Sequence, residues 1–190
     1  FGGPDRAHES FTDKQKAISY SMTSFFTTGG IRGGKKKLDK FYPRSFNMGI
    51  KADVYRKLGG FSDMRFGEDI DFSIRIFKAG CKCRLFPGAW VWHKRRTDFH
   101  KFFRQVYNSG IARINLYKKY PESLKLVHLL PTVFTLGVGL LTLLFIAGLA
   151  HIAYYHGNPQ AQLIGAAISI FALMPLLLYS GLIFFDSAIK

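Results

Sequence analysis

Two long apolar segments occupy the C-terminal third of the sequence. They run from Leu129 to Ala153 and from Ala161 to Phe185, and no Lys or Arg occurs between Leu126 and Ile189. A helix needs about 20 apolar residues to cross a bilayer, and each segment exceeds that length. Apolar runs this long are rare in soluble proteins, so we expect the two segments to span a membrane as a helical hairpin.

Charged residues lie almost entirely before these segments. Residues 1–123 hold 25 of the 27 Lys and Arg residues and 11 of the 12 Asp and Glu residues. The connection over 154–160 has no Lys or Arg, whereas Lys118, Lys119 and Lys125 precede the first segment. The positive-inside rule therefore places residues 1–125 in the cytoplasm, in a multi-pass protein of the inner (plasma) membrane. Basic residues spread over several elements fit a membrane surface better than a nucleic acid, so no nucleic-acid partner is expected.

Before the apolar segments, the sequence alternates short helical and strand patterns. Periodicity and breaker residues predict helices over 11–26, 52–58, 67–79 and 98–120, and strands over 45–50, 82–86 and 89–93. This α/β pattern predicts a globular part over residues 1–97, an amphipathic helix and linker over 98–124, and the hairpin over 125–190. The amphipathic helix has Phe residues on one face and Lys and Arg on the other, which is typical of helices that lie on a membrane surface.

A glycine-rich basic stretch runs from Thr27 to Lys37. It contains four glycines and four cations, which predicts a loop. Such a loop is either simply solvated or in contact with anions or lipid headgroups, and the composition does not choose between the two.

Adjacent carboxylates open the predicted helix over 67–79. Glu68 and Asp69 fall in its first turn, and Asp71 follows two residues later. A carboxylate at a loop-to-helix junction that faces a cleft can accept a proton from a hydroxyl nucleophile. The same acids can instead cap the helix, with Asp71 paired to Arg75 four residues later. Spacing alone leaves both interpretations open.

Around these acids the chain resembles the family 2 glycosyltransferases, which are inverting enzymes of the GT-A fold. The resemblance covers roughly residues 45–110 and rests on the order of Gly59-Gly60-Phe61, Glu68-Asp69-Ile70-Asp71, Arg75, Gly80, Pro87 and Val91-Trp92-His93. It implies that the α/β part is the C-terminal, acceptor-side part of a GT-A domain. The donor-binding half, with the family's Asp-x-Asp motif, is expected upstream of Phe1, and this chain alone is expected to be inactive.

The resemblance also implies roles for individual residues. Asp69 matches the general base, with Glu68 beside it, and His93 matches a ligand of the divalent metal, Mn²⁺ or Mg²⁺. That metal would neutralise the diphosphate of the nucleotide-sugar donor and would be held mainly by the missing half. A histidine at a strand end is otherwise most often structural. The predicted substrate-binding residues are Asp71, Arg96, Arg104 and Gln105.

Processive members of the family carry Gln-x-x-Arg-Trp on a helix near the membrane. Gln105 is present here, but the Arg-Trp pair is missing, which favours transfer of a single sugar. The sequence therefore predicts a membrane-bound inverting glycosyltransferase that acts on a lipid-linked or polysaccharide acceptor of the cell envelope. The alternative is a non-enzymatic membrane adaptor or transport component with a basic cytosolic domain, which would need neither Asp69 nor a metal.

Overall fold

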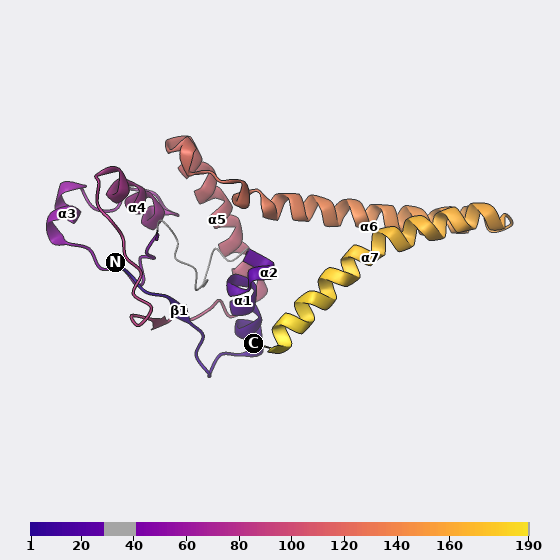
Figure 1. Ribbon diagram of the computed structural model, residues 1–190, viewed down its shortest axis with the longest axis horizontal. Helices are drawn as coiled ribbons and strands as arrows, with labels where there is room; N and C mark the ends of the chain where they lie inside the picture. Colours follow the sequence, from indigo (N-terminus) through magenta and orange to yellow (C-terminus); the bar gives the residue numbers. More distant parts are fainter. Residues whose placement is uncertain (29–40, 190) are drawn as a thin grey trace. The chain divides into compact units, whose positions relative to one another are not determined.

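The computed structural model describes residues 1–28 and 41–189 and divides the chain into two compact units, Phe1–Leu124 and Lys125–Lys190 (Figure 1). The basic loop predicted between Thr27 and Lys37 lies outside the described residues, apart from Thr27 and Thr28 at the end of a helix. Helices predominate in the described part of the chain, where the named strands are short.

The first unit contains most of the predicted helices. Its described elements are β1 (Asp5–Arg6), α1 (Asp13–Thr23), α2 (Phe25–Thr28), α3 (Ala52–Lys57), α4 (Glu68–Lys78), β2 (Val91–Trp92), α5 (Phe99–Lys119) and the 3₁₀ turn η1 (Pro121–Ser123). The single helix predicted over 11–26 is wrong in one respect, because the chain is extended at Ser24 (φ −66°, ψ 142°) and separates α1 from α2.

The predicted strands are much shorter than expected. β1 and β2 pair in parallel over two residues each, so the strand predicted over 89–93 shrinks to Val91–Trp92. The segments predicted as strands over 45–50 and 82–86 form only isolated bridges among the described residues: Met48 and Leu85 each bridge to Gly2, and Asn47 bridges to Arg44. A two-stranded pair is only marginally stable without further strands beside it, and the described residues supply none. The α/β prediction therefore holds only in part: the described part of the first unit is mostly helical, with one short pair of parallel strands.

Helix α4 is bounded by glycines in a left-handed conformation. It follows Gly67 at φ +84° and ends just before Gly80 at φ +75°, a region that L side chains rarely adopt. A Cβ on Gly67 would lie 3.1 Å from the Cβ of Ala112, so α5 packs directly on the turn that starts α4. Ile74 and Leu116 are buried together in the core between the two helices. The acidic first turn of α4 is thereby held against α5.

Helix α5 is amphipathic, as predicted. Asp98 caps it by accepting a hydrogen bond of 2.7 Å from the backbone N–H of Lys101. The buried residues of the helix are Ala112 and Leu116. Its large exposed apolar side chains are Phe99, Phe103, Val106, Tyr107, Ile111, Ile114 and Tyr117.

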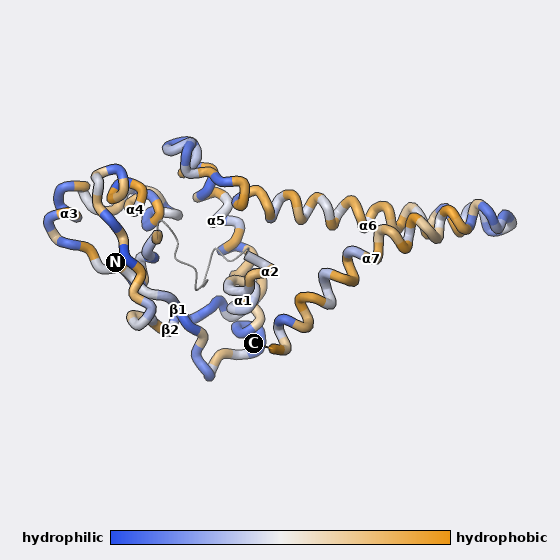
Figure 2. Tube along the Cα trace, in the orientation of Figure 1, coloured by the Kyte–Doolittle hydropathy of each residue, from blue (hydrophilic) through white to orange (hydrophobic). Residues whose placement is uncertain are grey.

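The second unit is a hairpin of two long helices, preceded by the 3₁₀ turn η2 (Leu126–His128). Helix α6 (Leu130–Tyr154) agrees with the predicted span to within one residue, whereas α7 (Pro159–Ile189) extends beyond it at both ends. The earlier start of α7 has a local cause, because Asn158 accepts a hydrogen bond of 3.2 Å from the N–H of Ala161. Both helices are long and apolar enough to cross a membrane, judged by length and composition, and Figure 2 shows the polar turn between them.

Small residues hold α6 and α7 together. A Cβ on Gly148 would lie 2.7 Å from the carbonyl oxygen of Gly165 and would also clash with the side chain of Ser169. A Cβ on Gly165 would lie 2.8 Å from the carbonyl oxygen of Gly148. Close backbone approach at small residues is the usual way in which helices associate within membranes.

Replacement of Gly148 by Leu is expected to destabilise the hairpin by about 1–3 kcal/mol, the usual cost of overpacking a close contact. Gly139 lies on the same helix with open space around its Cβ position, so Gly139→Leu is the matched control. The measurement is the midpoint of helix loss by circular dichroism when SDS is titrated into detergent-solubilised protein. Equal midpoints for the two variants would contradict the packing argument.

Candidate active site

Asp69 lies in the first turn of α4, close to the surface. The residue is 8 % exposed, and its Oδ2 lies 3.6 Å from Nη1 of Arg44. Its Oδ1 accepts a hydrogen bond of 2.8 Å from the N–H of Ile70, and the hydroxyl of Ser73 donates to its carbonyl oxygen. Glu68 precedes it and is half-buried. The carboxylate of Asp69 is thus fixed by the helix terminus and retains some access to solvent.

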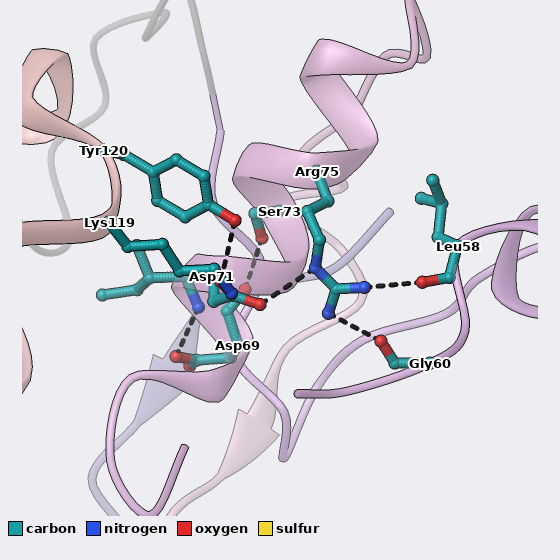
Figure 3. Close-up of polar contacts among 9 residues, drawn as sticks. Leu58, Gly60, Asp69, Asp71, Ser73, Arg75, Lys119 and Tyr120 are labelled. Atoms are coloured by element: carbon teal, nitrogen blue, oxygen red, sulfur yellow. Dashed lines mark hydrogen bonds and ion pairs between the residues drawn. The ribbon is translucent and has the colours of Figure 1, made fainter. Parts of the chain in front are cut away.

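Asp71 is surrounded by partners and has no exposed surface (Figure 3). Its Oδ2 accepts a hydrogen bond of 2.9 Å from Nε of Arg75, and its Oδ1 accepts from Nζ of Lys119 at 2.7 Å and from the hydroxyl of Tyr120 at 3.0 Å. Burial by itself would raise the pKa of Asp71, but the hydrogen bonds from Lys119, Tyr120 and Arg75 outweigh it and lower that pKa.

The substrate-binding role predicted for Asp71 does not fit this geometry, because the side chain is fully buried and both oxygens are occupied. The structure contains instead the pair with Arg75 that the sequence offered as the alternative. Arg75 also donates to the carbonyl oxygens of Leu58 at 2.7 Å and Gly60 at 2.6 Å. Asp71 therefore joins α4 to the end of α5 and, through Arg75, to the loop that follows α3.

Because the pKa of Asp71 is lowered in the folded protein, the stability that Asp71 contributes depends on pH. In the unfolded chain the carboxyl has its ordinary pKa of about 4, so its contribution to stability is present above that value and is lost as the pH falls through the lowered pKa. We expect the difference in unfolding free energy between the wild type and Asp71→Asn to shrink as the pH falls from about 6 to about 3. Tryptophan fluorescence in denaturant titrations measures it, and a difference that stays constant over this range would contradict the prediction.

His93 follows β2, and its ring contacts Phe46 and Arg95. Its ring stacks on Phe46 with centroids 4.0 Å apart, and its Nδ1 lies 3.3 Å from Nη1 of Arg95. Arg95 is itself buried and pairs with Asp5 at 2.6 Å. Phe46 lies two residues after Arg44, so the segment over 44–46 connects the Asp69 carboxylate with the His93 ring.

The described residues do not by themselves form a metal site. Within residues 1–28 and 41–189 no three His, Cys, Asp or Glu side chains come together in a way that could hold a metal ion. Mg²⁺ and similar ions prefer several oxygen ligands, whereas His93 contributes one nitrogen beside the guanidinium of Arg95. Its role as a metal ligand stays a prediction that depends on residues outside this chain.

Arg96 and Gln105, two of the predicted substrate-binding residues, meet at the start of α5. Nε of Arg96 donates to Oε1 of Gln105 at 3.0 Å, on the exposed side of the unit. Arg104 is exposed one position earlier on the helix. The structure therefore brings together Arg96 and Gln105, which the sequence placed on separate elements.

Arg44 and Phe46 were missed by the sequence analysis. No spacing rule relates residue 44 to Asp69 or residue 46 to His93, because the contacts join segments far apart in the chain. The available signals were a cation just before a short predicted strand and an aromatic residue within it, and neither signal is specific.

Comparisons with known proteins find similarity to glycosyltransferases. A family model described as "Glycosyl transferase family group 2" matches residues 45–185, which is more than half of the chain. The probable glycosyltransferase YdaM of Bacillus subtilis (strain 168) is 32% identical over 59 residues, equal to 31% of this chain and 14% of that protein. The chain thus spans only a small part of the relative's length. No solved structure matches the chain.

Proposed function

Because the chain belongs to the glycosyl transferase family group 2, and is thus part of a glycosyltransferase, we propose that Asp69 is the general base of an inverting sugar transfer. The family membership favours this enzyme over the non-enzymatic adaptor. The observation that carries the proposal is a contrast between neighbouring acids. The side chain of Asp69 is 12% exposed and pairs with Arg44 at 3.6 Å, whereas Asp71 is fully buried with both oxygens occupied.

The proposed reaction is a single displacement. A carboxylate oxygen of Asp69 takes the proton of the acceptor hydroxyl as the hydroxyl oxygen attacks the anomeric carbon of the donor sugar. The bond between that carbon and the diphosphate oxygen breaks, and the nucleoside diphosphate leaves with the electron pair. Attack opposite the leaving group inverts the anomeric centre. Glu68, adjacent in sequence, is proposed to assist Asp69 through its negative charge.

Substrate contacts are proposed for the exposed residues at the start of α5. Arg96 and Gln105 are hydrogen-bonded there, and Arg104 is exposed beside them. Guanidinium groups suit phosphate oxygens because they donate two parallel hydrogen bonds. These three residues are proposed to line the entrance through which donor and acceptor reach Asp69.

The donor-binding half of the enzyme is proposed to lie in the part of the protein outside this chain. It would complete the GT-A fold and supply the Asp-x-Asp motif, with which His93 is proposed to share a divalent metal. When bound, such a metal neutralises the charge that develops on the departing diphosphate.

A location at the inner membrane is proposed from the hairpin and from α5. Two helices long enough to span a bilayer follow a unit that carries most of the positive charge. The exposed apolar side chains of α5 share their helix with Lys101, Arg104 and Lys118, which suits a surface of anionic lipid. A lipid-linked or polysaccharide acceptor of the cell envelope would be reached from that position.

The proposed function is tested by sugar transfer from a nucleotide sugar, with Asp69→Asn compared with Asp63→Asn in the longest protein that carries this chain. Normal transfer by Asp69→Asn would remove Asp69 as the base.

A further inference from the structure

Arg44 begins a tight turn that ends at Asn47. The N–H of Asn47 donates a hydrogen bond of 2.8 Å to the carbonyl oxygen of Arg44, and Pro43, the residue before the turn, is fully buried. Nδ2 of Asn47 donates to the carbonyl oxygen of Ala89 at 2.8 Å. A Cβ on Gly2 would lie 2.5 Å from the carbonyl oxygen of Asn47, so the turn is also packed closely against the start of the chain. The backbone that carries Arg44 is therefore fixed on both sides of the turn.

The turn brings Arg44 to one oxygen of Asp69. Oδ1 of Asp69 accepts a hydrogen bond of 2.8 Å from the N–H of Ile70, and Oδ2 lies 3.6 Å from Nη1 of Arg44. Among residues 1–28 and 41–189, Arg44 provides the ion pair of this carboxylate. Because one oxygen is held by the helix backbone and the other faces a guanidinium, rotation of the carboxylate is restrained from two sides.

The contact between Arg44 and Asp69 leaves the carboxylate able to accept a proton. A charge-assisted hydrogen bond of this kind is about 2.7–2.9 Å long, and the observed 3.6 Å exceeds it. Asp71 has the opposite arrangement, because its oxygens accept hydrogen bonds of 2.7 to 3.0 Å from three side chains. Arg44 can therefore orient Asp69 without occupying the oxygen that would take the proton.

We propose that Arg44 is a positioning residue for Asp69, placed by the turn over 44–47. The inference rests on the proposed function, in which Asp69 takes the proton of the acceptor hydroxyl. Proton transfer needs the base within hydrogen-bond distance of that hydroxyl, and a displacement of about 1 Å can cost about 100-fold in rate. Arg44 holds the carboxylate in the productive orientation before the acceptor binds, and it acts through Asp69 rather than on a substrate.

The proposal is tested by steady-state sugar transfer in the longest protein that carries this chain. Arg44→Gln is expected to lower kcat about tenfold, because one of the two restraints on Asp69 is lost, and to leave KM for both substrates within about twofold. Arg44→Lys is expected to stay within about threefold of the wild-type kcat, since a single long contact needs the charge but not the guanidinium fork. Ser45→Ala in the same turn and Arg56→Gln on α3 alter exposed residues and are the controls, expected within about twofold.

A double-mutant cycle with Asp69→Asn separates a positioning role from direct substrate contact. In the Asp69→Asn background, Arg44→Gln is expected to lower the residual rate less than about twofold further, because no base remains to be positioned. A further tenfold loss in that background, or a raised KM with unchanged kcat in Arg44→Gln, would show that Arg44 acts on a substrate and would overturn the proposal.

The remaining outcomes distinguish this inference from the proposed function. Normal transfer by Arg44→Gln with impaired transfer by Asp69→Asn overturns the role of Arg44 and leaves the proposed base in place, whereas normal transfer by Asp69→Asn removes both. The urea midpoint of Arg44→Gln, followed by the fluorescence of Trp90 and Trp92, is expected to match that of the wild type. A rate loss that accompanies a lower midpoint and is not restored in Arg44→Lys would assign Arg44 to the fold and contradict a positioning role.

Discussion

Replacement of Asp69 by Asn is expected to lower sugar transfer by at least about 100-fold, because a positioned general base contributes roughly 10²–10⁴ in rate. The amide has nearly the same size as the carboxylate and keeps an oxygen that can accept from the N–H of Ile70. It loses the negative charge that takes the acceptor proton. The measurement is the initial rate of transfer from a nucleotide sugar by the membrane-embedded protein.

Two controls make this result specific to the base. Asp63→Asn removes a carboxylate from the exposed loop before α4 and is expected to leave the rate within about twofold. The contact of Asp69 with Arg44 is long and partly exposed, so its loss is expected to cost less than about 1 kcal/mol of stability. A rate that stays within tenfold of the wild type in Asp69→Asn would assign the proton transfer to another group.

Replacement of Asp71 by Ala is expected to destabilise the first unit by about 3 kcal/mol, the lower end of the cost of breaking a buried ion pair. The variant leaves Arg75 without its carboxylate partner, while Lys119 can turn toward solvent because its side chain is already 45% exposed. The physical cause is the loss of the hydrogen bonds by which Asp71 of α4 binds Lys119 and Tyr120 at the end of α5.

The stability of the first unit can be measured by tryptophan fluorescence. The two tryptophans of the chain, Trp90 and Trp92, both lie in the first unit, so their fluorescence reports its unfolding and not that of the hairpin. Urea titration of the full chain in detergent micelles gives the midpoint. Asp53→Ala, an exposed acid of α3, is the control and is expected to shift stability by no more than about 0.5 kcal/mol. Equal midpoints for the two variants would show that the Asp71 contacts do not stabilise the unit.

Together the two acids illustrate what tertiary contacts add to a motif. Asp69 and Asp71 are two residues apart on one helix, and helical geometry places them about 200° apart around its axis. One therefore faces the surface while the other faces α5. The sequence identified both as candidates, and the packing of α5 buries Asp71 while Asp69 keeps some exposed surface.

Local rules predicted the elements whose causes are local. Apolar length predicted α6 and α7, and Gly67 and Gly80 predicted the limits of α4. The strands were overestimated because pairing depends on neighbouring strands, which a single segment does not reveal. The family prediction is confirmed by the match over residues 45–185, since the order of several short motifs is more specific than any one of them.

The sequence by itself determined the apolar hairpin, the separation of charge from it, and the family with its pair of adjacent carboxylates. These properties depend on the order of residues along the chain. Only the tertiary structure decided that Asp71 is fully buried, that Arg96 meets Gln105, and that Arg44 lies beside Asp69. The contacts of Asp69 and Asp71 join segments far apart in the chain, and Asp71 is buried because α4 and α5 pack their apolar faces against each other.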